Sequence, residues 1–185
     1  LSSLSEIVSL AASSGLSGVA VKSGAVGVTI PISSANGSGA IEFNVNTQSP
    51  PSMPTGQTNN STPVSQVYDF NMSVGGQAVT QFTVPVQISL QVNPDDNIDT
   101  DLLTLAKIIE GKLEFYGGKY EDGRIFENRD TLSPYVVVEN KVKFNDVANV
   151  QSWAGRQIEV IAAKGAIEGK AAGVFAPSDD VTRAE

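Results

Sequence analysis

Residues 78–92, with the sequence AVTQFTVPVQISLQV, decide the fold class, because apolar and mostly polar side chains alternate along them. From Phe82 to Val92 every second residue is apolar. Successive side chains of an extended strand point to opposite faces, so this period of two places the apolar residues on one face of a sheet. The stretch therefore predicts a strand with one buried face and one face in water.

Similar β-rich runs lie on both sides of this stretch and are separated by turn-forming residues. Gly75-Gly76 predicts a hairpin, and Asp122-Gly123 predicts a type I′ turn. Roughly eight strands with regular turns favour an antiparallel β-sandwich over a barrel. The expected strands cover residues 19–21, 25–31, 40–45, 67–74, 78–92, 102–109, 112–116, 124–127 and 135–138.

The remaining segments predict two helices and one long loop. Apolar spacing indicates a short helix over 5–12, closed by Gly15, and a second helix over 152–164 that stops at Gly165. Residues 47–66 contain four prolines among Ser, Thr, Asn and Gln, so we expect a long exposed loop there. The change of period after Asn140 divides the chain into a β-sandwich domain, 1–140, and a helical segment, 141–185.

Composition limits the chemistry that the chain can perform. Apolar residues make up 41% of the sequence, enough for a core, and the net charge of −8 disfavours binding to nucleic acid or to an anionic membrane. The sequence contains no run of about eighteen apolar residues, the length that a membrane-spanning helix needs, which argues against membrane insertion. The chain has no Cys and no His, which removes thiolate nucleophiles, histidine bases and most transition-metal sites. We therefore expect a protein that is not an enzyme and has no cofactor.

One acidic stretch has the composition of a Ca²⁺ site. Asp95, Asn97, Asp99 and Asp101 provide alternating oxygen ligands. The stretch lacks the loop glycine, and no carboxylate occupies the twelfth position from Asp95. A solvated turn between strands is the alternative interpretation, and it needs no metal.

The C-terminal residues resemble the surface-layer homology (SLH) module of bacterial cell-surface proteins. The matching residues are Phe144-Asn145-Asp146-Val147, Trp153-Ala154, Ile158-Glu159, residues 162–169, Phe175-Ala176-Pro177 and Val181-Thr182-Arg183-Ala184-Glu185. The resemblance covers about a quarter of the chain. It departs from the family at Ser152, where a histidine is common, and at Ala166, where a larger aliphatic is usual.

This resemblance implies non-covalent anchoring to secondary cell-wall polysaccharide, on the outside of the cell at the wall or S-layer surface. Arg183 matches the motif arginine, whose guanidinium suits an acidic sugar substituent. Trp153 matches a position that can lie against a sugar ring, and Asp146 matches one that can bond sugar hydroxyls. An alternative stands beside each role: Trp153 could belong to a core, Asp146 could cap a turn, and Arg183 could be a solvated side chain.

The residues Thr182 to Glu185 form a capping box, which predicts the start of a further helix. We therefore expect the chain to be part of a longer protein, with a partial SLH module. In this family the modules come in threes and the sugar grooves form between them, so the isolated chain should bind wall polysaccharide weakly or not at all. The incomplete module is also expected to expose apolar surface, through which the chain could form a homodimer.

The sandwich resembles β-rich segments that precede such anchors in Gram-positive surface proteins, on residues 28–31, 84–88 and 131–137. We expect a spacer or adhesion module. The alternative is a carbohydrate-binding or accessory domain of an SLH-anchored extracellular enzyme that degrades polysaccharide. A third class, self-cleavage between Leu132 and Ser133, needs a histidine where this chain has Thr131.

Overall fold

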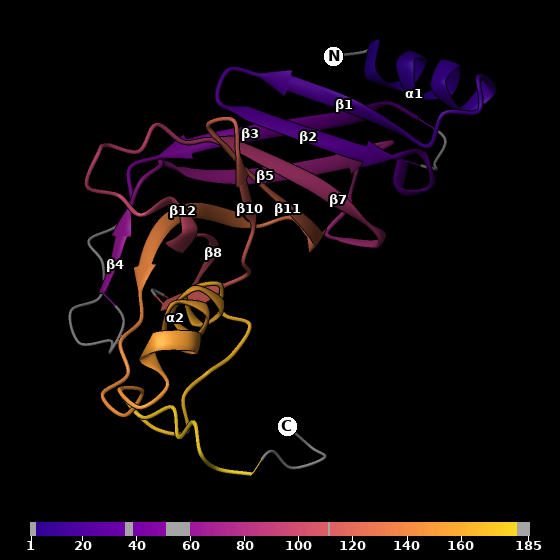
Figure 1. Ribbon diagram of the computed structural model, residues 1–185. Helices are drawn as coiled ribbons and strands as arrows, with labels where there is room; N and C mark the ends of the chain where they lie inside the picture. Colours follow the sequence, from indigo (N-terminus) through magenta and orange to yellow (C-terminus); the bar gives the residue numbers. More distant parts are fainter. Residues whose placement is uncertain (1–2, 36–38, 51–59, 111, 181–185) are drawn as a thin grey trace.

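The computed structural model describes residues 3–35, 39–50, 60–110 and 112–180, and it contains two antiparallel sheets with a helix toward each end of the chain (Figure 1). The predicted fold class, an antiparallel β-sandwich followed by a small helical part, is confirmed. Thr182 to Glu185, and with them the capping box, lie outside the described residues.

The first sheet has the strand order β1-β2-β7-β11-β10, and every neighbouring pair is antiparallel. Asp122 and Gly123 both have positive φ, 49° and 74°, as a type I′ turn requires, and they join β10 to β11. The strands are β1 (Gly18–Ser23), β2 (Val26–Pro31), β7 (Gln81–Gln91), β10 (Lys119–Glu121) and β11 (Arg124–Thr131).

The second sheet has the order β3-β5-β12-β8-β9, with two short strands added beside this path. β4 pairs with β12, and β6 pairs with β5 across the predicted Gly75-Gly76 hairpin. The strands are β3 (Ile41–Gln48), β4 (Asn60–Pro63), β5 (Val67–Val74), β6 (Gln77–Ala78), β8 (Leu103–Ile109), β9 (Lys112–Phe115) and β12 (Pro134–Lys141).

The helical segments lie around the sandwich. α1 (Ser3–Ser13) confirms the first predicted helix, and Gly15 follows it with a φ of 72°. Near the C-terminus, one turn of π-helix precedes α2, and Gly165 ends the helix with a φ of 73°. The other segments are η1 (Ile32–Ala35), η2 (Thr100–Leu102), η3 (Gln151–Gly155) and α2 (Arg156–Ala163).

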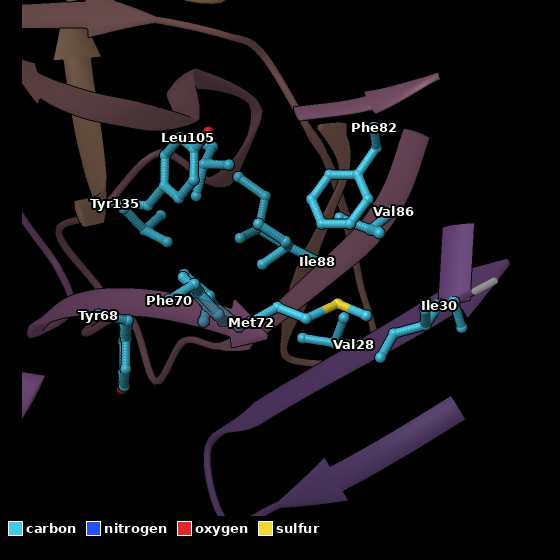
Figure 2. Packing of buried hydrophobic residues seen from close by; sticks show 14 of the residues in the cluster. Val28, Ile30, Tyr68, Phe70, Met72, Phe82, Val86, Ile88, Leu105 and Tyr135 are labelled. Carbon is cyan, nitrogen blue, oxygen red and sulfur yellow. The ribbon is translucent and has the colours of Figure 1, made fainter. Parts of the chain in front are cut away.

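The main core lies between the two sheets (Figure 2). Ile88 and Leu90 of β7 face Phe70 and Tyr135 of the second sheet across it, and each is at most 2% exposed. Burying an aliphatic or aromatic side chain of this size contributes about 1.5–3 kcal/mol. The alternation that predicts β7 therefore provides much of one wall of the core.

The prediction of an unbroken strand over 78–92 is wrong in part. Gln77–Ala78 belong to β6, and β7 begins only at Gln81. Val84 was expected on the buried face, but it is 43% exposed. The cause is a register shift: Arg129 pairs with Val86, whereas Thr131 pairs with Gln81. The extra residues of β7 form a bulge there, which breaks the alternation.

The prediction of a continuous loop over 47–66 is also wrong in part, since β3 extends to Gln48 and Asn60–Pro63 form β4. β12 pairs with β5 only at Pro134 and Tyr135 and needs another partner for the rest of that edge. β4 supplies it. Because the residues of β4 are polar or proline, no hydrophobic pattern indicates a strand there.

β12 is buried on both faces, which explains its continuous apolar sequence. Val137 faces the main core, whereas Val136 and Val138 belong to a second cluster with Val67 and Ala106 on the outer face of the sheet. The three valines are 0% exposed. α2 lies beside β12 and β8 in Figure 1 and contacts β12 and η2. The C-terminal segment thus packs against the second sheet.

Candidate functional site

The C-terminal segment is folded onto the sandwich through α2. Ile158, Ala162 and Ala163 of this helix are buried. Gly165 then comes so close to β9 that a Cβ atom at this position would lie 2.8 Å from the Phe115 carbonyl oxygen. The positive φ and this close approach both require glycine.

Arg156, at the start of α2, joins the helix to the acidic turn before β8. Its Nη2 donates to Asp99 Oδ1 at 2.8 Å and to Asp101 Oδ2 at 2.9 Å, and its Nη1 donates to Glu159 Oε2 at 3.1 Å. The hydrogen bond from Arg156 lowers the pKa of Asp99. The Arg156 side chain is 43% exposed, so water screens these ion pairs and each contributes at most about 1 kcal/mol.

The acidic turn is therefore engaged with the helix. Asp99 Oδ1 also accepts from the N–H of Asp101 at 3.1 Å and caps η2, while Asp95 Oδ1 accepts from the N–H of Asn97 at 3.1 Å. Among the residues that the structure describes, no group of three or more Asp, Glu, His or Cys is arranged to hold a metal. The Ca²⁺ interpretation stays a prediction, and it would require Arg156 to release two of the four residues.

Two further polar contacts, one buried at Asn140 and one half-buried at Lys164, lie in the same junction. Asn140 is 0% exposed; its Nδ2 donates to the Ala163 carbonyl at 3.0 Å, and its Oδ1 accepts from Ser61 Oγ at 3.0 Å. Lys164 Nζ donates to the carbonyls of Gly118, at 2.8 Å, and of Leu103. Burial lowers the pKa of Lys164. A buried donor or acceptor without a partner costs about 1–3 kcal/mol, so these bonds favour the docked helix.

Asp146 stabilises a loop of the C-terminal segment. Its Oδ1 accepts from the N–H of Phe175 at 2.9 Å and its Oδ2 from the N–H of Ala176 at 2.6 Å, and these bonds lower its pKa. Ala176 has a φ of 60°, and the rings of Phe144 and Phe175 pack with centroids 5.2 Å apart. The Asp146 carboxylate thus stabilises a turn, and each of its two oxygens already accepts a backbone hydrogen bond.

Trp153 and Arg183 are the other two predicted site residues. Trp153 lies in η3 and is 71% exposed, so it does not belong to a core. No hydrogen bond or ring contact joins Trp153 to Asp146 in the described part of the chain. Arg183 lies outside the described residues.

Sequence reasoning missed the residues that make the junction, Arg156, Lys164 and Asn140. Each is a common surface residue type, and no motif of the sandwich indicates their partners. The continuous apolar run of β12 was the available signal, because burial of a strand on both faces requires a second layer.

The comparisons with known proteins concern the C-terminal segment first. Residues 143–185 match the family described as the S-layer homology domain, and this segment is an SLH module at the C-terminal end of the chain. Members of this family attach proteins to the cell surface. No helix in the described ranges is long and apolar enough to cross a membrane.

A curated relative contains a similar segment. The chain is 29% identical over 124 residues to the amylopullulanase of Thermoanaerobacterium thermosulfurigenes. The match covers 66% of this chain and 6% of that protein. The chain thus spans a small part of the length of this relative.

Proposed function

We propose that this chain is the wall-anchoring part of a bacterial surface protein. In this proposal the SLH segment binds secondary cell-wall polysaccharide without a covalent bond, and the sandwich serves as a non-catalytic spacer or adhesion module. The single observation that carries the proposal is the match of residues 143–185 to the S-layer homology domain. The contacts of Arg156, Lys164 and Asn140 join the helix α2 of this segment to the sandwich. A docked helix holds the anchor in a fixed orientation relative to the sandwich.

The division into a sandwich, 1–140, and an SLH segment, 141–185, is part of the proposal. The two parts differ in the period of their sequence and in their secondary structure. The absence of His and Cys from the sequence supports a role without catalysis.

The residues that we propose to serve sugar binding are Trp153, Asp146 and Arg183. The exposure of Trp153 leaves its ring free to lie against a sugar. Asp146 would contribute by shaping the loop at Phe175 and Ala176, because both of its oxygens already accept backbone hydrogen bonds. Arg183 would bind an acidic group on the polysaccharide.

Fractionation of producing cells tests the proposal. Antibodies raised against this chain should detect the parent protein in the isolated wall fraction. Guanidinium chloride, or chemical removal of the secondary polysaccharide, should release it while the peptidoglycan stays intact. Recovery in the cytosol, or release only by a muramidase that cuts peptidoglycan, would contradict non-covalent anchoring.

A second candidate function follows from the similarity to an amylopullulanase. In this alternative the sandwich is a carbohydrate-binding or accessory domain of an extracellular polysaccharide-degrading enzyme. Native electrophoresis through gels with and without pullulan distinguishes the two. Retardation of the chain by pullulan supports the alternative, and unchanged mobility favours the spacer.

The homodimer also stays a prediction. Trp153 and Ile161 are 71% and 41% exposed, and they provide apolar surface on the C-terminal segment. Sedimentation velocity at increasing concentration should show a monomer–dimer equilibrium that Trp153→Ala weakens. A single monomer species at every concentration would remove the dimer.

A further inference from the structure

The sandwich contains an apolar slot at its open side, between the outer strands of the two sheets and next to α1. The slot has a volume of about 490 Å³, within the range of small-molecule sites. One wall comes from β2, the other from β3, and α1 contributes lining residues at the side. The residues that define it are Val26, Val28, Phe43, Val45, Leu4 and Ile7.

A polar cleft of about 480 Å³ adjoins this slot. Its polar lining consists of the uncharged side chains of Ser65, Gln66, Gln91 and Asn93, together with Tyr68. The slot and the cleft share Ala25, Gln66 and Tyr68. They therefore lie side by side, and together they make a hollow with an apolar part and a neutral polar part.

Tyr68 lies where the two parts meet. It is only 6% exposed, and no described residue forms a hydrogen bond with its hydroxyl group. Figure 2 shows the Tyr68 ring directed away from Phe70, with the oxygen at its far end. The hydroxyl is not among the described atoms that are fully buried without a partner, so it keeps contact with solvent. The hydroxyl is therefore available to a molecule inside the hollow.

The charges around the hollow limit the class of that molecule. Among the described lining residues, the slot and the cleft have no Asp, Glu, Lys or Arg. Arg124 is close enough to influence the Tyr68 hydroxyl. Its Nη2 donates to the Ala25 carbonyl at 3.0 Å and to the Ser89 carbonyl at 3.1 Å, whereas its buried Nε has no partner among the described residues. A cationic group would lose water there and gain no oppositely charged partner, which is costly. An anionic group would gain only attraction at a distance from Arg124, which lines neither the slot nor the cleft.

We propose that this hollow binds a neutral amphiphile, with its aliphatic body in the slot and a hydroxyl-bearing head in the cleft. The Tyr68 hydroxyl pairs with the head at the boundary. Gln66, Gln91 and Asn93 offer amide donors and acceptors to further hydroxyls of the head. An alkyl glycoside has this combination of parts. The site is separate from the SLH segment and does not depend on the anchoring function.

Titration with octyl glucoside below its critical micelle concentration tests the proposal. Calorimetry should detect saturable binding, and methyl signals of Val26, Val28 and Val45 should shift in ¹H–¹³C spectra. Octylammonium and octanoate should bind at least about tenfold more weakly, because a charged head has no partner in the cleft. Glucose, which lacks the aliphatic body, should not bind measurably.

Three variants separate this site from general adsorption. Val26→Trp fills the slot and should abolish binding, whereas Val84→Trp makes the same change at an exposed position of β7 that lines neither part. Tyr68→Phe keeps the ring and should weaken binding about 2- to 10-fold through loss of one hydrogen bond. If Val26→Trp fails to fold, the methyl shifts and Tyr68→Phe still decide. Equal binding to wild type and Tyr68→Phe together with unshifted methyl signals, or no saturable binding to wild type, would overturn the proposal.

Discussion

Replacement of Lys164 by Met tests the docking of α2 on the sandwich. The side chain is about the same length, but it has no N–H to donate to the carbonyls of Gly118 and Leu103. Lys22→Met is the matched control, because Lys22 lies exposed on β1 and makes no hydrogen bond or ion pair that the structure records.

The expected loss of stability follows from two opposing effects. Hydrogen bonds to a charged group contribute about 1.5–3 kcal/mol each. Burial of the ammonium group, which lowers the pKa of Lys164, offsets part of this gain. We expect a net loss of about 2 kcal/mol, which in a chain of this length lowers Tm by about 4–8 °C.

Two probes distinguish a loosened helix from a general loss of stability. Far-ultraviolet circular dichroism is dominated by the strands, whereas fluorescence comes mainly from Trp153, the one tryptophan in the sequence. Because Trp153 is 71% exposed, the fluorescence anisotropy is followed, which falls when η3 loses its fixed position. In wild type both transitions should coincide, as expected for one cooperative unit. In Lys164→Met the fluorescence transition should occur at a lower temperature than the strand transition. A Tm within about 1 °C of that of Lys22→Met, with coincident transitions, would refute the reasoning.

Four further predictions concern single groups. Burial raises the pKa of Glu127, so the stability that its protonated form provides is lost as pH rises through the raised pKa. Glu127→Gln should therefore increase the free energy of unfolding by up to about 1 kcal/mol at neutral pH, whereas the control Glu110→Gln should not. Urea unfolding measures the difference. Arg156 lowers the pKa of Asp99, so stability should fall as pH drops below about 4, and Asp99→Asn should flatten this dependence in acid titrations. Asp146→Ala frees the N–H groups of two loop residues, so their hydrogen exchange should accelerate. Calorimetry with Ca²⁺ should give no binding heat, since Arg156 holds two of the four candidate ligands; saturable heat would show that it releases them.

The strands that carry the core could be predicted because local pattern and burial agree. The alternation from Val86 to Leu90 matches the inner face of β7, and Asp122-Gly123 forms the turn that its residue types require. The bulge that exposes Val84 could not be predicted, because it depends on the pairing of β7 with β11. β4 was missed for a similar reason: the edge of β12 fixes it, and its own residues give no apolar signal.

The candidate site also has a part that could be predicted from the sequence and a part that could not. The residues of the SLH segment are contiguous, and their order identifies the family without a structure. The junction joins Arg156 to Asp99 and Asp101, more than fifty positions away, and Lys164 to carbonyls of β8 and of the turn before β10. Main-chain acceptors have no sequence signature. Contacts of this kind become visible only when the fold brings the segments together.

Native-state hydrogen exchange tests the central claim most directly, namely that the sandwich holds the SLH segment in a docked position. The Lys164 N–H donates to the Val160 carbonyl at 3.1 Å, and the Val137 N–H of β12 donates to Ser65 Oγ at 2.9 Å. If α2 and the sheet open together, both amides should exchange with the same free energy of opening, close to that of global unfolding. Exchange at Lys164 about a hundredfold faster or more, as in a frayed helix, would contradict the docked arrangement.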